Sequence, residues 1–166
     1  MRCPDRVAKG PRNRASARTS IYRVHLLEQL VDNCRLLELS PRGDERGSLI
    51  PLETGRDVPF DIKRVYYLFG TVPDAQRGFH AHRDLEQLAV CVAGACTMVL
   101  DDGRSRREVR LDRPDKGLFL GPFVWREMRD FTADAVLLVL ASKPYDEADY
   151  IRSYPDFLAA IEEAQR

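Results

Sequence analysis

Two of the three histidines in this 166-residue chain, His80 and His82, stand two positions apart. Their surroundings predict a β-strand, because Gly78 and Phe79 lead into the pair and an apolar run with β-branched members follows from Gln87. Residues two apart on a strand point to the same face, so both imidazoles are directed at one point. Imidazole has a pKa of about 6.5 and can accept or donate a proton near neutral pH. The pair therefore predicts a site for proton transfer or for metal binding.

Glu86 adds a carboxylate four residues after His82. With His80 and His82 it could form a set of two histidines and one carboxylate around a divalent metal. Two other roles remain open for Glu86, which are the orientation of one imidazole and a salt bridge in the wall of the fold. The third histidine, His25, lies alone among apolar residues and is interpreted as structural.

From residue 34 onward the chain reads as short apolar runs separated by turns, which is typical of an all-β sandwich or barrel. The pairs Ala93-Gly94 and Asp102-Gly103 each predict a tight hairpin between two such runs. We expect strands over residues 35–39, 47–52, 62–69, 79–82, 87–93, 95–100, 106–111, 117–120, 124–128 and 135–141.

The chain divides into three predicted segments. Residues 1–30 form a basic extension that we expect to be disordered, since residues 1–23 carry seven arginines and lysines against the single acid Asp5. Residues 31–145 form the β-domain. Residues 146–166 form a helical segment packed on it, because Phe157, Leu158 and Ile161 recur at helical spacing within 156–165.

Composition excludes several classes of protein. Lysine plus arginine equals aspartate plus glutamate at 26 each, so the chain lacks the basic excess of a nucleic-acid-binding protein. No run approaches the roughly 18 apolar residues of a membrane span. No secretory signal is visible, and the four cysteines show no C-x-x-C spacing, so we expect a cytoplasmic protein with free thiols.

The strand series, the His-x-His pair, Glu86, Gly94 and the stretch 117–122 resemble the two motifs of the cupin superfamily. This resemblance implies a cupin-type jelly-roll antiparallel β-barrel, to which the sequence adds one short C-terminal helix. In metal-binding cupins a histidine of the second motif completes the metal site, and here Arg126 stands at that position. Arginine stays protonated and would place a positive charge beside a dication, so we expect neither a metal nor another cofactor.

A narrower resemblance extends from Leu36 to Phe157. The matching blocks look like those of the sugar 3,4-ketoisomerases, cupin enzymes that move the keto group of dTDP-4-keto-6-deoxy-glucose from C4 to C3 during synthesis of 3-amino-3,6-dideoxyhexoses. The family typically has histidine at position 126. The blocks are 46–49, 62–67, 77–82, 86–87, 100–103, 121–122, 124–125, 146–147 and 149–152.

The resemblance also implies roles for individual residues. The histidine pair and one tyrosine carry over as catalytic residues, with His82 as the acid and base at carbon, His80 as the proton shuttle between oxygens, and Tyr67 preferred over Tyr66 as the donor to the oxyanion. A diphosphate requires arginines and a nucleobase requires an aromatic face. The candidates for substrate binding are Arg46, Gly47, Arg64, Tyr66, Arg77, Trp125 and Arg126.

Members of this family form homodimers in which an N-terminal strand is exchanged between the subunits, and the resemblance implies that Cys34–Ser40 is this strand. The Arg46-Gly47 pair resembles the type of enzyme whose product has the galacto configuration. Two alternatives remain open, namely a metal-dependent cupin such as a dioxygenase or phosphosugar isomerase, and a cupin that binds a nucleotide sugar without turnover. Binding of nucleic acid through the basic extension is a distant third.

Overall fold

Two antiparallel β-sheets packed face to face make up most of the structure, a computed structural model that describes residues 25–72 and 74–166. The larger sheet has six strands, in the spatial order β1, β2, β10, β7, β12, β5. Their bounds are β1 His25–Val31, β2 Cys34–Glu38, β5 Arg64–Leu68, β7 Gln87–Ala93, β10 Lys116–Leu120 and β12 Val136–Ala141.

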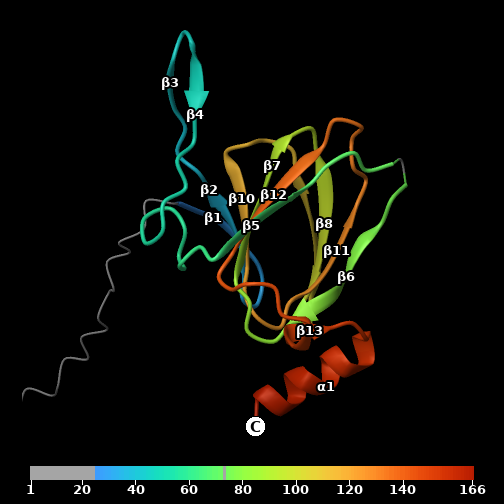
Figure 1. The fold of residues 1–166 in the computed structure, drawn as a ribbon. Helices are drawn as coiled ribbons and strands as arrows, with labels where there is room; N and C mark the ends of the chain where they lie inside the picture. The colour runs from blue at the N-terminus through green and yellow to red at the C-terminus, as the bar shows by residue number, and fades with distance from the viewer. Residues whose placement is uncertain (1–24, 73) are drawn as a thin grey trace, which may run out of the picture.

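The smaller sheet has five strands, in the spatial order β13, β6, β11, β8, β9. These are β6 Arg77–His82, β8 Cys96–Asp101, β9 Arg106–Leu111, β11 Trp125–Arg129 and β13 Tyr150–Ile151. A separate hairpin, β3 Arg42–Asp44 with β4 Gly47–Leu49, stands away from both sheets (Figure 1).

The predicted all-β class is confirmed, with one difference in closure. The two sheets remain separate, so the fold is a jelly-roll sandwich and not a closed barrel. Each of the ten predicted strands overlaps an observed one. The strands β1, β3 and β13 were not predicted as strands, and β1 begins at His25, inside the predicted extension of residues 1–30. The rest of that extension, residues 1–24, lies outside the described residues.

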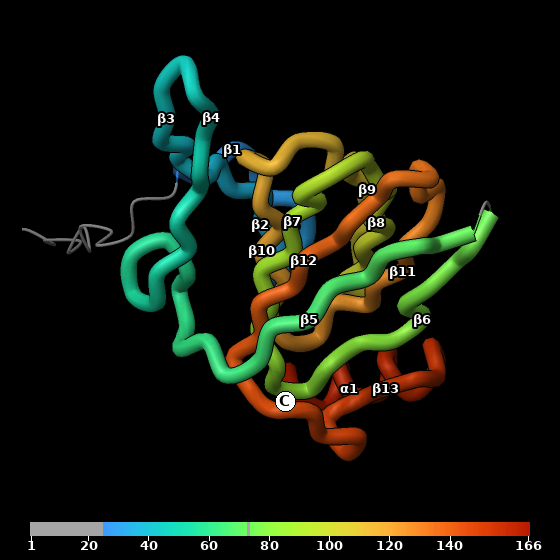
Figure 2. Tube along the Cα trace, turned by 45° about the horizontal axis from the view of Figure 1, so that its top comes forward, coloured from blue at the N-terminus to red at the C-terminus, as the bar shows by residue number. Residues whose placement is uncertain are grey.

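The main core lies between the sheets because alternate residues of each strand point inward. Met98 and Leu100 of β8 pack with Leu118 and Leu120 of β10, and all four are buried. A second apolar cluster lies on the outer face of the larger sheet, where Val58 and residues around it cover β7. Figure 2 shows this covering segment as a loop that runs beside the larger sheet.

The C-terminal helix α1, Tyr154–Ala164, confirms the predicted terminal helix. Its start is specified locally, since the Ser153 hydroxyl accepts a hydrogen bond from the Asp156 N–H and Pro155 occupies the first turn. Phe157 is fully buried against Trp125 of β11, so α1 covers the outer face of the smaller sheet. Among the described residues, no helix is long and apolar enough to cross a membrane.

Candidate active site

Strand β6 holds His80 and His82 on one face, as their spacing predicted. The two rings meet edge to face, with centroids 4.9 Å apart. A β-bulge precedes them, where Gly78 and Phe79 adopt φ angles of 90° and 53° opposite Arg126. A side chain on Gly78 would bring a Cβ to 2.6 Å from the Arg126 carbonyl oxygen, so only glycine allows the two strands to approach this closely.

Asp149 is the carboxylate that contacts the histidine pair. Its Oδ2 lies 2.8 Å from His82 Nδ1, and its Oδ1 accepts a hydrogen bond of 2.8 Å from the Asp84 backbone N–H. The Arg83 N–H donates to the backbone carbonyl of Asp149, which fixes the same segment. An ionised carboxylate only accepts hydrogen bonds, so it selects the tautomer in which His82 Nδ1 carries the proton and Nε2 carries the lone pair.

Glu86, which the sequence analysis considered for orienting an imidazole, does not contact either histidine. Its backbone N–H donates to the Ser142 hydroxyl, and its carboxyl lies near Arg35 and Asp84. Within residues 25–72 and 74–166 no three His, Cys, Asp or Glu side chains are placed to hold a metal ion. The ligand set His80, His82 and Glu86 required by the metal-dependent alternative is therefore not assembled.

Tyr150 packs against both imidazoles. Strand β13 pairs with β6 so that Tyr150 lies opposite His82, and the Tyr150 ring centroid is 4.2 Å from that of His82 and 5.1 Å from that of His80. Sequence reasoning missed Tyr150 and Asp149 as site residues because they lie more than 60 positions from the histidines, in the segment assigned to packing. The one available signal was the block 149–152, which belongs to the family resemblance.

Both histidines are neutral at neutral pH. Burial, together with the positive charge of Arg126, lowers the pKa of His80 to about 4 and that of His82 to about 2. His82 is only 1% exposed, and its Nε2 has no hydrogen-bond partner among the described residues. A neutral imidazole with an unengaged Nε2 lone pair and an anchored Nδ1–H is arranged to act as a base.

Arg126 lies in the interior of the sandwich, where it is 2% exposed. Its Nε and Nη2 donate to the Val124 carbonyl at 3.0 and 2.7 Å, and its Nη1 donates to Gln87 Oε1 at 2.6 Å. No carboxylate of the described chain lies within ion-pair distance of the Arg126 guanidinium. Burial lowers the pKa of Arg126 to about 10, which still leaves the guanidinium protonated at neutral pH. An unneutralised positive charge therefore lies beside the histidines.

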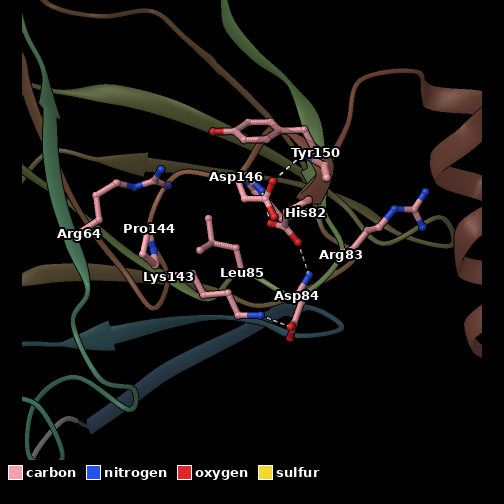
Figure 3. A pocket seen from close by; sticks show the side chains of 11 residues that line it. Arg64, His82, Arg83, Asp84, Leu85, Lys143, Pro144, Asp146 and Tyr150 are labelled. Atoms are coloured by element: carbon pink, nitrogen blue, oxygen red, sulfur yellow. Dashed lines mark hydrogen bonds and ion pairs between the residues drawn. The ribbon is translucent and has the colours of Figure 1, made fainter.

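Two adjoining cavities surround these groups. The larger, about 500 Å³, is lined by Tyr150 and by five of the predicted site residues, namely His80, Tyr66, Tyr67, Arg64 and Arg77. The smaller, about 250 Å³, is shown in Figure 3, where Arg64, His82 and Tyr150 surround the space and Lys143 pairs with Asp84 at its edge. Arg64 and Tyr150 line both cavities.

Tyr66, and not Tyr67, presents its hydroxyl to the interior. Neighbouring residues on β5 face opposite sides of the sheet, and the Tyr66 hydroxyl accepts a hydrogen bond of 2.8 Å from Gln87 Nε2. Tyr67 is 60% exposed and packs against Phe69, so it reaches only the rim of the larger cavity. Of the two tyrosines, Tyr66 is therefore the one whose side chain points into the sandwich, whereas Tyr67 points to the exposed side of β5.

The ring of Trp125 faces the C-terminal helix and not the two cavities. Trp125 neighbours Arg126 on β11 and therefore points to the opposite face, where its ring packs against Tyr154 and Phe157 under α1 and is 5% exposed. Arg46 and Gly47 lie on the exposed β3–β4 hairpin, with Arg46 paired to Asp44. Neither of these two residues reaches the cavities of its own chain.

The low pKa values of His80 and His82 predict that the protein becomes less stable as the pH falls from about 6.5 toward about 4. In that window the unfolded chain, with histidine pKa values of about 6.5, binds more protons than the folded chain, and each histidine contributes at most about 1.4 kcal/mol per pH unit. Urea unfolding between about pH 7 and pH 5 measures the slope. The variant His80→Asn/His82→Asn should have a flatter slope than wild type, and an unchanged slope in this variant contradicts the assignment.

Comparison with known proteins gives the family. The family model FdtA: WxcM-like, C-terminal matches residues 32–162. A TDP-4-oxo-6-deoxy-alpha-D-glucose-3,4-oxoisomerase of Aneurinibacillus thermoaerophilus is 54% identical over 114 residues, or 69% of this chain and 82% of the relative. A 3,4-ketoisomerase structure from Helicobacter canadensis is 48% identical with a TM-score of 0.76, covering 78% of this chain and 98% of its own. QdtA, a sugar 3,4-ketoisomerase from Thermoanaerobacterium thermosaccharolyticum in complex with TDP, is 41% identical with a TM-score of 0.79, covering 81% and 98%. The chain therefore belongs to the FdtA family of sugar 3,4-ketoisomerases.

Proposed function

We propose that this chain moves the keto group of dTDP-4-keto-6-deoxy-glucose from C4 to C3 and so forms a dTDP-3-keto-6-deoxyhexose. The observation that carries the proposal is the neutral, buried His82, whose Nδ1–H is held by Asp149 and whose Nε2 is unengaged, in a chain 54% identical to an oxoisomerase of this type. A ketone activates the hydrogen on its neighbouring carbon, so the reaction needs a base at C3 and an acid at C4.

His82 supplies the proton transfers at carbon in this proposal. Its Nε2 removes the C3 proton, the C3–H electron pair forms the C3=C4 bond, and the carbonyl electrons move to O4, giving an enediolate. The imidazolium then returns a proton to C4. Asp149 holds the ring in place and stabilises the imidazolium, which partly offsets the low basicity caused by burial.

His80 and Tyr66 act on the oxygens. A proton must leave O3 as O4 receives one, and His80, beside His82 on the same face, carries that proton. The Tyr66 hydroxyl donates to the developing oxyanion, and the Arg126 charge favours the anionic enediolate over the neutral ketone.

Arginines at the larger cavity bind the nucleoside diphosphate in this proposal. Arg64 and Arg77 line the space beside His80, and a guanidinium pairs well with phosphate oxygens. Arg46 and Gly47 lie away from the cavities of their own chain, so their contribution to binding requires a second subunit. The galacto configuration at C4 remains a proposal that rests on this Arg46-Gly47 pair.

The product places this enzyme before an amination step. A keto group at C3 is what an aminotransferase converts into an amine, which supports a role in making 3-amino-3,6-dideoxyhexoses for polysaccharides. The cysteines Cys34, Cys91 and Cys96 are buried free thiols, which supports a cytoplasmic location.

In D₂O, wild-type protein should convert dTDP-4-keto-6-deoxy-glucose to the 3-keto sugar with deuterium at C4, and His82→Asn should do so at least about 10²-fold more slowly, because the general base is lost. NMR at C3 and C4 follows the exchange and reads the C4 configuration. His25→Asn, which changes an exposed histidine of β1, should exchange at the wild-type rate. Tight binding of dTDP with no exchange by the wild type would instead favour the non-catalytic alternative.

Asp149→Asn should lower kcat by about 10- to 10³-fold while leaving the fold intact. The introduced amide can donate to Nδ1 and so favour the tautomer in which Nε2 carries the proton, which cannot act as a base. The steady-state rate and the circular dichroism spectrum together measure this effect. Asp112→Asn, which alters a surface pair with Lys116, serves as the matched control. A wild-type kcat in Asp149→Asn would show that the carboxylate does not position His82.

We infer that two copies of the chain associate through the outer face of the larger sheet. A groove of about 530 Å³ lies on this face, lined by Leu49, Val92 and Leu138. Val65 and Tyr67 of β5, which pair with β12 in register, extend the same apolar surface and are exposed. An apolar surface of this extent favours burial against a second copy. Exchange of Cys34–Ser40 remains a proposal, since in the single chain β2 pairs with its own β10.

Sedimentation should give a mass near twice the 19.0 kDa of one chain, and Val92→Lys should shift it toward 19.0 kDa by placing a charge in the groove. Leu158→Lys on α1 is the control and should leave the mass unchanged. A wild-type mass of 19.0 kDa contradicts the dimer. For strand exchange, Glu38→Cys/Lys116→Cys joins positions paired between β2 and β10. A covalent dimer on oxidation supports exchange, whereas a covalent monomer contradicts it.

A further inference from the structure

A line of hydrogen bonds crosses the sandwich from Arg126 to Tyr66 through Gln87. Arg126 Nη1 donates to Gln87 Oε1 at 2.6 Å, and Gln87 Nε2 donates to the Tyr66 hydroxyl at 2.8 Å. The three side chains come from β11, β7 and β5, which belong to both sheets. Gln87 is 3% exposed, so water does not compete for these bonds.

The direction of each bond in this line is fixed by chemistry. A guanidinium has only donors, so the atom of Gln87 that faces Arg126 must be its carbonyl oxygen. The amide NH₂ then has to face Tyr66, because the carboxamide has no other polar end. The Tyr66 oxygen is therefore an acceptor toward Gln87, and its own proton must point elsewhere.

Breaking the hydrogen bond from Arg126 Nη1 to Gln87 Oε1 would leave a buried donor unpaired. The Nε and Nη2 of Arg126 are both engaged by the Val124 carbonyl, which fixes the plane of the guanidinium and the direction of Nη1. Breaking the Nη1 bond in this buried position costs about 1–3 kcal/mol for an unsatisfied group, and more for a charged one. The amide of Gln87 is therefore held in one orientation.

We propose that Gln87, anchored by Arg126, is a positioning residue that turns the Tyr66 proton into the cavity, where Tyr66 donates it to the developing oxyanion. The inference rests on the proposed function only for the identity of that oxyanion. The Tyr66 hydroxyl lines the same cavity as His80, so a proton turned away from Gln87 faces the space where the sugar reacts.

Gln87→Glu reverses the bond at nearly constant volume. The introduced carboxylate still accepts from Arg126 Nη1 and gains an ion pair, so the fold should be retained. Its second oxygen can only accept, so the Tyr66 hydroxyl must donate to it and presents only lone pairs to the cavity. The variant therefore keeps every side chain in place and changes only the direction of one hydrogen bond and the local charge.

Gln87→Glu should lower kcat by about 10²-fold, the scale of losing one oxyanion donor, with KM within about threefold of wild type. Tyr66→Phe should lose a similar amount, and the double variant should be no slower than the worse single variant, since both changes remove one donor. Gln165→Glu is the matched control, because Gln165 Oε1 accepts from Arg104 in a second Arg–Gln pair on the surface. The proposal is wrong if the fold-loss of kcat in the double variant equals the product of the losses in the two single variants. It is also wrong if Gln87→Glu has a wild-type kcat.

A second readout does not require turnover. With ¹³C-labelled tyrosine, the Tyr66 signal, assigned by its loss in Tyr66→Phe, should titrate at higher pH in Gln87→Glu than in wild type, because the phenol donates to a carboxylate there. An unchanged titration of Tyr66 would contradict the proposed positioning of its proton by Gln87, even if the enzyme is active. If the wild type is inactive but Tyr66 titrates at higher pH in Gln87→Glu, the proposed function is wrong and the positioning of Tyr66 by Gln87 is still supported. If Gln87→Glu does not fold, Gln87→Met should still lower kcat about 10-fold, and a wild-type kcat overturns the proposal.

Discussion

The burial of one unneutralised positive charge is the constraint on which the site depends. Removing a guanidinium from water is costly, and no carboxylate of the described chain forms an ion pair with Arg126. The guanidinium donates instead to two neutral oxygens, those of Val124 and Gln87. These oxygens satisfy its donors but do not neutralise its charge. This charge disfavours a proton on either histidine and favours an anion in the cavity. The same side chain thus adds to the effect of burial on the histidines and favours the enediolate.

The second constraint is that the site is assembled from segments far apart in the chain. His82 is on β6, its carboxylate partner is 67 residues later, and the strand β13 that carries Tyr150 is only two residues long. So short a strand is held by what surrounds it, namely pairing with β6 and the packing of α1 beneath it. The C-terminal segment therefore does more than cover the sheet. It carries Asp149, whose carboxylate fixes the tautomer of His82.

Strand alternation explains both what could be predicted from the sequence and what could not. The His80/His82 spacing placed two imidazoles on one face, and the turn signals located nearly all of the large-sheet and small-sheet strands. The same rule also applies to the adjacent pairs Tyr66-Tyr67 and Trp125-Arg126, since only one member of each pair can point into the interior of the sandwich. Which member does so depends on sheet register, and register is set by contacts between distant strands that no local pattern records. Asp149 was missed for a related reason, because its partner is tertiary.

Position 126 shows how a permanent charge can be built into the interior of a β-sandwich. A histidine there could donate or accept at either nitrogen and could lose its charge near neutral pH. Arginine can do neither, so it fixes the direction of the bonds through Gln87 to Tyr66 and keeps a permanent charge in the core. Three hydrogen bonds and nearly complete burial show that this arginine is an integrated part of the sandwich. The fixed charge of Arg126 therefore gives the hydrogen bonds through Gln87 to Tyr66 a direction that does not change with pH.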